Sequence, residues 1–402
     1  MFIYHDLNIG GIQKFLIFLI RELKKKNIRI IWLTQSDPVV AVGFKKDIED
    51  IEKYYIDYKN FNSLKKLKIN FTNDEEILAL AFSFREYCNL ERFKKYNNQY
   101  NISTIFWVPH FEGRDIFFEE YFYFPINKIL KKYLKNCYEE MDKNNNIFYV
   151  NELHLNEIEK KYKIKVENRE NKIYKNINIG NKYEFNSEKI LKKYNQKFFN
   201  ILTIGRFDIP HKGYIIGLID SYRNLKKKYP KIQLSIIGYG NDEKIVLDKI
   251  NSLSFQEKKY LKLIGKVEYD ELKKYFDEAN LFIGVAGAIR DASTAGVLSV
   301  PVRHYSLECE GYGFSYEKKE MAVSKEKGIK IDFFIEKVIQ MSYQEYFLKS
   351  KKTYEIYNSS ELSIGNQILS LRNKTKKNTI SFIVMELVHI MLFFYKNLIN
   401  LK

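Results

Sequence analysis

Cysteine is scarce in this chain of 402 residues, which carries Cys88, Cys137 and Cys309 and no others. An odd number of widely spaced cysteines supplies neither a disulfide framework nor the spacing of a metal site. Such cysteine usage fits a protein of the reducing cytoplasm. No pair of carboxylates has convincing metal-ligand spacing either. We therefore expect no bound metal and no cofactor.

Long apolar segments are also missing. Near the N-terminus, the run FLIFLI is short, its basic cluster follows it, and no small-residue cleavage site is present, so we predict no secretory signal. The apolar run 380–395 is interrupted by Ser381, Glu386 and His389. As a helix it would extend about 24 Å, less than the roughly 30 Å of a hydrocarbon core. We predict an amphipathic helix that packs across the first domain or lies at a membrane interface, rather than a transmembrane span.

Acidic residues are outnumbered, with 50 Asp and Glu against 67 Lys and Arg and a formal net charge of +17. This excess indicates an acidic partner, such as a phosphate-bearing small molecule, anionic lipid or nucleic acid. The lysines are scattered over helix faces, which biased amino-acid usage would also produce. No groove-reading motif or aromatic-basic platform is visible, so we expect no nucleic-acid partner.

Short apolar runs alternate with amphipathic segments of helical length, which is the pattern of parallel sheets covered by helices. The runs are 2–5, 28–33, 77–82, 102–108, 147–150, 200–205, 232–237, 261–264, 281–285 and 299–302. A polar, Asn-rich segment at 166–199 separates the first group from the second. We therefore predict an α/β protein of two doubly wound, Rossmann-like domains with a ligand cleft between them.

These patterns divide the chain into four parts. We predict a first domain over 1–175, a linker over 176–199, a second domain over 200–365, and a basic, amphipathic helical tail over 366–402.

The sharpest motif is Gly205-Arg206 followed by Lys212-Gly213. The strand ILTIG ends at Gly205, Arg206 leaves its carboxyl edge, and Lys212 stands just before a predicted helix. Two cations and a helix N-terminus then point at one spot, an arrangement that suits a diphosphate. Gly238 ends the next strand, where a glycine lets a ligand or another chain segment approach closely.

The predicted first domain offers two further candidates. Gly10 and Gly11 make a glycine turn after the first strand. His110 ends the strand of FWVPH, where it could position or deprotonate an acceptor hydroxyl, or serve as a structural loop histidine.

Taken in order, these motifs resemble the GT-B glycosyltransferases. GRF…HKG, LSIIGYGND, LIGKVEYDELKKYFDEANLFIGV and AGVLSVPV resemble the C-terminal half of the group, closest to family 4 and its relatives in cell-surface glycan synthesis. GGIQKFLIFLIRELKKKN resembles the N-terminal half, and KIYKNINIG resembles the interdomain segment.

The resemblance implies that the second domain binds a nucleotide-sugar at its strand ends. It places Arg206 and Lys212 at the cations of the donor diphosphate, with Gly205 and Gly238 beside them. The glycine loop of the first domain, acceptor-side in this group, would face the cleft. Stabilising the leaving nucleoside diphosphate matters most in such a reaction, and the two cations would do so without a metal.

One departure from the group concerns two glutamates that it usually places eight residues apart. An alignment on Pro301 puts Thr294 and Ala286 at these positions, and an alignment on Gly296 puts Asp291 at the second. The Pro301 alignment runs through TAGVLSVPV without a gap, so we prefer it, and the pair is degenerate either way.

Nearby side chains could replace the missing carboxylates. Asp291 could act from the previous helical turn, and Arg290 could meet a charged donor. Glu308 and Glu310, which follow the last strand, could contact ribose hydroxyls or lie in a solvated loop.

We therefore predict a metal-independent glycosyltransferase of the hexosyltransferase type in surface polysaccharide synthesis, moving a sugar from a nucleotide-sugar to a glycan or lipid-linked acceptor. It would be cytoplasmic, with peripheral contact to the inner membrane face through 374–402. Two alternatives keep the fold: a non-catalytic partner that binds glycan or nucleotide-sugar, and a nucleotide-sugar epimerase.

Overall fold

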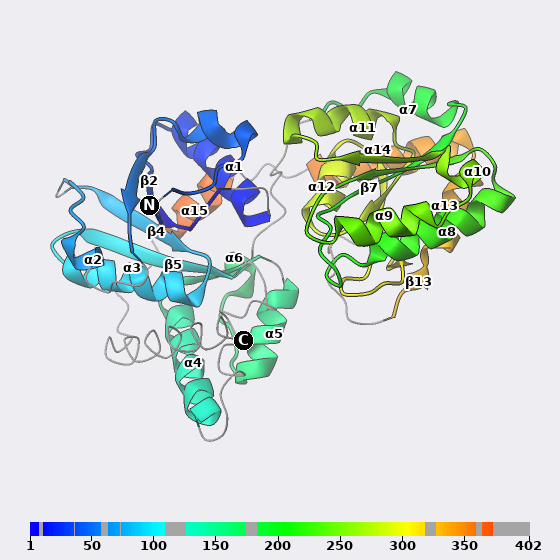
Figure 1. Cartoon of the computed structure of the whole chain (residues 1–402). Helices are drawn as coiled ribbons and strands as arrows, with labels where there is room; N and C mark the ends of the chain where they lie inside the picture. Colours follow the sequence, from blue (N-terminus) through cyan, green and yellow to red (C-terminus); the bar gives the residue numbers. More distant parts are fainter. Residues whose placement is uncertain are drawn as a thin grey trace. The chain divides into compact units, whose positions relative to one another are not determined.

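The computed structural model describes residues 1–7, 11–35, 37–57, 63–72, 74–108, 126–150, 152–173, 183–317, 327–358 and 364–372. The chain forms two compact units, Met1–Ile179 with Leu362–Lys402, and Gly180–Glu361 (Figure 1). Each unit is an α/β domain with its own parallel sheet.

The first unit contains a sheet of six parallel strands in the order β3-β2-β1-β4-β5-β6. The strands are β1 (Phe2–Ile3), β2 (Ile31–Thr34), β3 (Glu52–Tyr55), β4 (Glu76–Ala81), β5 (Asn101–Val108) and β6 (Ile147–Tyr149). This order, in which the chain starts in the middle of the sheet and visits each edge in turn, is that of a doubly wound fold. Every strand except β3 falls on a predicted apolar run.

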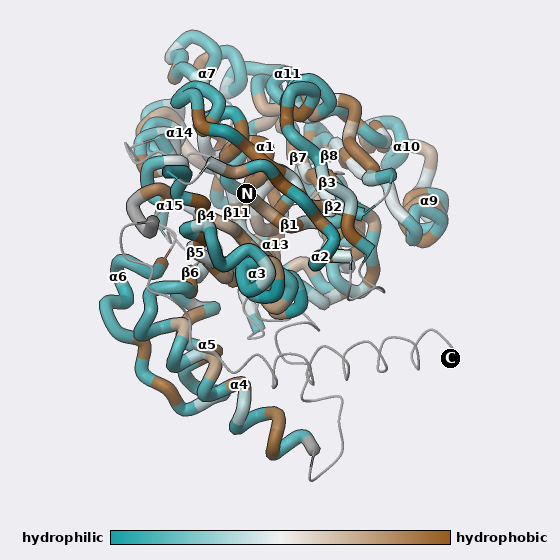
Figure 2. The backbone as a smooth tube through the Cα atoms, turned by 90° about the vertical axis from the view of Figure 1, so that its left-hand side faces the viewer, coloured by the Kyte–Doolittle hydropathy of each residue, from teal (hydrophilic) through white to brown (hydrophobic). Residues whose placement is uncertain are grey.

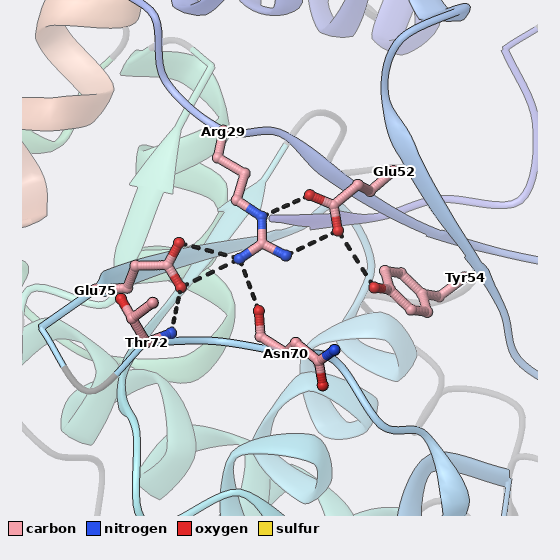
Figure 3. Close-up of polar contacts among 6 residues, drawn as sticks. All are labelled: Arg29, Glu52, Tyr54, Asn70, Thr72 and Glu75. Atoms are coloured by element: carbon pink, nitrogen blue, oxygen red, sulfur yellow. Dashed lines mark hydrogen bonds and ion pairs between the residues drawn. The ribbon is translucent and has the colours of Figure 1, made fainter.

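Strand β3 escapes prediction because it is a half-buried edge strand with the polar sequence EKYY. An edge strand need not be apolar on both faces. Arg29 ties it to the sheet, since its Nη2 donates to Glu52 Oε2 at 2.8 Å and its Nη1 to Glu75 Oε1 at 3.0 Å and the Asn70 carbonyl at 2.9 Å (Figure 3).

Helices cover both faces of the first sheet. They are α1 (Gly11–Lys25), η1 (Val42–Ile48), α2 (Ser63–Lys66), α3 (Phe84–Tyr96), α4 (Ile126–Lys143), α5 (Glu152–Tyr162), α6 (Arg169–Lys172) and α15 (Ile364–Arg372). Trp32 and Trp107 share one apolar cluster with α1 and with Ile368 of α15, while Leu33 and Phe106 share another with α3 and α4. Alternate residues of each strand thus face opposite layers.

The second unit contains five parallel strands in the order β11-β10-β7-β8-β9. They are β7 (Phe199–Ile204), β8 (Ile232–Ile237), β9 (Leu261–Gly265), β10 (Leu281–Gly284) and β11 (Leu298–Pro301), and all five fall on predicted runs. A short hairpin of β12 (Glu310–Gly311) and β13 (Ile329–Lys330) follows.

The helices of this unit are α7 (Ser187–Tyr194), α8 (Tyr214–Lys228), α9 (Glu243–Asn251), α10 (Phe255–Lys258), η3 (Tyr269–Glu271), α11 (Leu272–Glu278), α12 (Gly287–Thr294), α13 (Ile331–Ile339) and α14 (Tyr343–Asn358). Figure 2 shows apolar stretches along the strands and alternating polar and apolar stretches along the helices.

Two boundaries differ from the sequence-based division. Residues 183–199, assigned above to a linker, belong to the second unit, where Ile190 of α7 and Tyr183 are buried in its core. Helix α15 belongs to the first unit. The predicted amphipathic segment 380–395 lies outside the described residues. Within the described part of the chain, no helix is long and apolar enough to span a bilayer.

Candidate functional site

The second sheet reverses its direction of winding between β7 and β10. From β7 the chain continues through β8 to β9 on one side, and it returns through β10 to β11 on the other. In doubly wound folds, ligands bind at the carboxyl ends of the strands beside such a switch point. Here the flanking loops are 205–213, which follows β7, and 285–286, which follows β10.

Glycines at the carboxyl ends of β7 and β10 let both strand ends pack closely against Tyr214 at this switch point. A Cβ atom at Gly205 would lie 3.3 Å from the Tyr214 hydroxyl, and one at Gly284 would lie 3.6 Å from the same oxygen. The Tyr214 hydroxyl also lies 3.3 Å from the hydroxyl of Thr203. The ends of β7 and β10 therefore both lie against the hydroxyl of Tyr214, the first residue of α8.

Gly238 is required by the packing of neighbouring backbone. A Cβ atom there would lie 2.1 Å from the carbonyl oxygen of Gly205 and 2.6 Å from the ring of Phe207. The glycine lets the ends of β7 and β8 approach one another, which is the structural alternative considered above.

The predicted cations lie in the loop that follows β7. Arg206 is exposed, and its Nη2 donates to Asp208 Oδ2 at 3.0 Å. Lys212 is half-buried, with its Cδ 3.3 Å from a Cβ built at Gly205, and its backbone N–H donates to the Asp208 carbonyl at 2.7 Å. The structure thus places both side chains in one short loop at the switch point.

The environment of Lys212 disfavours its charge. Burial, followed by the nearby guanidinium of Arg206, lowers the pKa of the Lys212 ammonium to about 8, although Asp208 acts in the opposite direction. An anion bound beside these two groups would favour the charged lysine again. A perturbed lysine beside an exposed arginine is therefore a strong candidate for binding phosphate.

Helix α12 begins on the other side of the switch point. Ala286, the residue before it, is exposed and has φ = 50° and ψ = −129°, a conformation that is strained for a residue with a side chain. One turn into the helix, Asp291 is 7% exposed and accepts a hydrogen bond from the Tyr269 hydroxyl at 3.2 Å. Because Tyr269 follows β9, Asp291 is connected to the same edge of the sheet.

Thr294 and Glu310 make contacts within the protein. The Thr294 hydroxyl is buried at the end of α12 and donates to the Asp291 carbonyl at 2.8 Å. Gly296, with φ = 72°, terminates the helix there. The carboxylate of Glu310 is buried and accepts from Arg303 at 3.1 Å and from the Gly328 N–H at 3.4 Å.

No protein-family model and no curated protein matches this sequence. Solved structures match the chain over most of its length. A mutant of Staphylococcus aureus TarM, in complex with fondaparinux, alpha-GlcNAc-glycerol and UDP, is 10% identical with a TM-score of 0.57, covering 92% of this chain and 99% of TarM. Anabaena HepE, in complex with UDP and glucose, is 13% identical with a TM-score of 0.56, covering 92% of this chain and 96% of HepE. WaaG, a glycosyltransferase involved in lipopolysaccharide biosynthesis, is 9% identical with a TM-score of 0.53, covering 94% of this chain and 99% of WaaG.

The chain has the GT-B fold. At these identities, the similarity establishes the GT-B architecture and assigns no role to individual residues. The fold prediction is thereby confirmed for the two parallel-sheet domains.

The remaining candidates of this GT-B chain are distributed between its units. Glu308 is exposed, and a Cβ atom at Gly217 of α8 would lie 2.9 Å from its carbonyl carbon. Gly11 is the first residue of α1, and a Cβ atom added there would meet nothing within 4 Å. Gly10 and His110 lie outside the described residues.

Three polar residues of the second unit were not singled out from the sequence. Asp208 pairs with Arg206, Tyr269 bonds to Asp291, and Asp242 Oδ2 accepts the Ile209 N–H at 2.7 Å. Each lies shortly after the carboxyl end of a strand, which is the signal that could have drawn attention to them. Among the described residues, no group of three or more His, Cys, Asp or Glu side chains could hold a metal ion.

Proposed function

We propose that this chain is a glycosyltransferase that binds a nucleoside-diphosphate sugar at the carboxyl edge of its second sheet. The observation that carries the proposal is the placement of Arg206 and Lys212 in one loop at the switch point, opposite the start of α12. Negative charge gathers on the departing diphosphate as the glycosidic bond breaks. Preorganised cations and helix N–H groups stabilise that charge.

In this proposal, Arg206 and Lys212 hold the two phosphates of the donor. They supply positive charge that a divalent metal would otherwise supply, so a chelator should leave activity unchanged. We propose that Asp291, which accepts a hydrogen bond from Tyr269, binds hydroxyl groups of the donor. Thr294 is the poorer choice, because its hydroxyl donates to the backbone of its own helix. Glu308 is the second candidate, and His110 remains the proposed acceptor-side base.

Uridine nucleotides are the first donors to test. HepE and TarM, which share the GT-B fold, were both crystallised with UDP. The acceptor that we propose is a glycan or a lipid-linked glycan precursor, as in surface polysaccharide synthesis. WaaG, of the same fold, acts in lipopolysaccharide biosynthesis.

Turnover separates transfer from the two alternatives. We expect UDP to be released from a UDP-sugar when a glycan acceptor is present and not without it. Isomerisation of the sugar without an acceptor would favour an epimerase. Binding of UDP without turnover on any acceptor panel would favour a non-catalytic partner.

We further propose that the protein works at an anionic membrane surface, contacted by helix α4. Its first ten residues carry Lys128, Lys131, Lys132 and Lys135 and no acidic residue, whereas its acidic residues all lie within the last five. Within this basic stretch, Lys128 and Lys132 are like charges four residues apart, as are Lys131 and Lys135, and such pairs destabilise a helix. An anionic surface that binds the lysines would offset this repulsion.

The side chain of Ile129 lies among these lysines and is 65% exposed. An exposed aliphatic group within a basic patch suits the interface of an anionic bilayer better than a nucleic acid. Figure 2 shows the alternating polar and apolar stretches of α4.

Vesicle sedimentation tests this contact. The full chain should bind vesicles that contain anionic lipid and lose most of that binding when the four lysines become glutamine. Changing Lys160, Lys161, Lys226 and Lys227, which end α5 and α8, is the control with the same charge. An equal loss of vesicle binding in both variants would show that binding depends on overall charge and not on α4. Segment 374–402 would then be the remaining candidate for a specific membrane contact.

A further inference from the structure

One carboxylate lies among the basic side chains of the loop 205–213. Asp208 Oδ2 is 3.0 Å from Arg206 Nη2 and 3.8 Å from His211 Nδ1. The side chains of Arg206 and Asp208 are 57% and 44% exposed. The proposed phosphate-binding arginine therefore already has an anionic partner in the free protein.

The Asp208 side chain contributes little to holding this loop. It is the backbone carbonyl of Asp208 that accepts the Lys212 N–H, at 2.7 Å. The next residue, Ile209, is fixed by its N–H bond to Asp242. An exposed ion pair such as Arg206–Asp208 adds little to folding stability. The main effect of the carboxylate therefore falls on the charges of Arg206 and Lys212.

We infer that Asp208 is an internal counter-anion that competes with the phosphates of the nucleotide for Arg206. A phosphate must displace the carboxylate from the guanidinium and then remain near its negative charge. Both effects weaken binding of the nucleoside diphosphate and hasten its release after transfer. This inference rests on the proposed function, because it assigns Asp208 a role at the same donor site.

The Asp208→Asn variant tests the inference, since it removes the charge and keeps the size of the side chain. Calorimetric titration with UDP, UMP and uridine measures the effect on phosphates separately from the effect on the nucleoside. We expect UDP to bind about two- to fivefold more tightly, the range of a surface ion pair. UMP should gain less, and uridine should bind as it does to the unaltered chain.

Asp220→Asn is the matched control. Asp220 lies on α8, its side chain is also 44% exposed, and it pairs with Arg223 at 3.3 Å and Lys249 at 2.6 Å. This variant changes the net charge by the same amount, but at a position outside the loop 205–213. Salt screens the effect of a charge at that position on the phosphate site. It should leave all three dissociation constants unchanged.

Asp208→Ala should change UDP binding in the same direction as the asparagine variant. In steady-state transfer assays, the inhibition constant of product UDP should fall by the same factor in both. Unchanged or weaker UDP binding in folded Asp208 variants would overturn the inference and leave the proposed function standing. If no nucleoside diphosphate binds even the unaltered chain, the proposed function falls, and the inference with it.

Discussion

Replacing Lys212 by methionine should stabilise the protein while removing its response to nucleoside diphosphates. Burial and Arg206 lower the pKa of this ammonium from 10.5 to about 8 in the free protein. At about 1.36 kcal/mol per pKa unit, holding the charge costs at most about 3 kcal/mol below pH 8. Water screens a half-buried group, so we expect a gain in unfolding free energy of about 1–2 kcal/mol. Methionine keeps the apolar stem beside Gly205.

The sign of the pH dependence follows from linkage. The pKa of Lys212 is lower in the folded than in the unfolded state, so the unfolded state binds more protons between pH 8 and pH 10.5. The unaltered chain therefore regains stability as the pH rises through this window. The advantage of the methionine variant should be complete at pH 7 and should shrink toward pH 10.5.

Thermal unfolding with and without UDP measures both effects. At pH 7, the variant should melt about 2–8 °C higher than the unaltered chain and show no shift with UDP. Lys262→Met, at an exposed position of β9, is the control and should keep the UDP shift. A Lys212→Met protein that melts lower and still responds to UDP would refute this account of Lys212.

Three other single substitutions test the site and the packing around it. Arg206→Ala should weaken UDP binding about 10- to 100-fold by calorimetry while changing the melting temperature little, because the side chain is exposed; full retention of UDP binding would remove Arg206 from the site. Gly238→Ala should lower the unfolding free energy by about 2–4 kcal/mol in urea titrations, since its Cβ would meet the Gly205 carbonyl at 2.1 Å, and a neutral effect would contradict that packing. Arg29→Gln should lower the unfolding free energy by about 1 kcal/mol at pH 7 (Figure 3). The hydrogen bond from Arg29 lowers the pKa of the Glu52 carboxyl, so this contribution should disappear as the pH falls through the Glu52 titration. An equal loss of unfolding free energy at pH 3 would argue against the pair.

The sequence predicts most of the sheet framework because parallel strands are buried on both faces. Runs such as 232–237 and 281–285 are largely apolar, and the helices between them have one apolar face. Strand β3 lacks this signal, since its polar side chains lie at an edge and are held by Arg29. The linker prediction extends too far because the polar surface of α7 hides its buried apolar anchor, Ile190.

At the candidate site, the sequence indicates the positions of cations better than their contacts. Arg206 and Lys212 are predicted from their places after a strand and before a helix, whereas the pairing of Arg206 with Asp208 depends on side-chain conformation. Whether Thr294 or Asp291 occupies the position of the second glutamate depends on whether the sequence is aligned on Pro301 or on Gly296. Gly296, in the left-handed conformation, ends α12, while Pro301 is the last residue of β11. Only backbone geometry distinguishes these two roles.

The central claim is that the loop after β7 binds the diphosphate of a nucleotide-sugar. Calorimetric titration of UDP into the unaltered chain and into an Arg206→Ala, Lys212→Met double variant tests it most directly. We predict a dissociation constant between about 1 μM and 1 mM for the unaltered chain, within the usual range of enzyme substrates, and at least about a 100-fold increase in the double variant. Equal UDP affinity in the two folded proteins would contradict the claim.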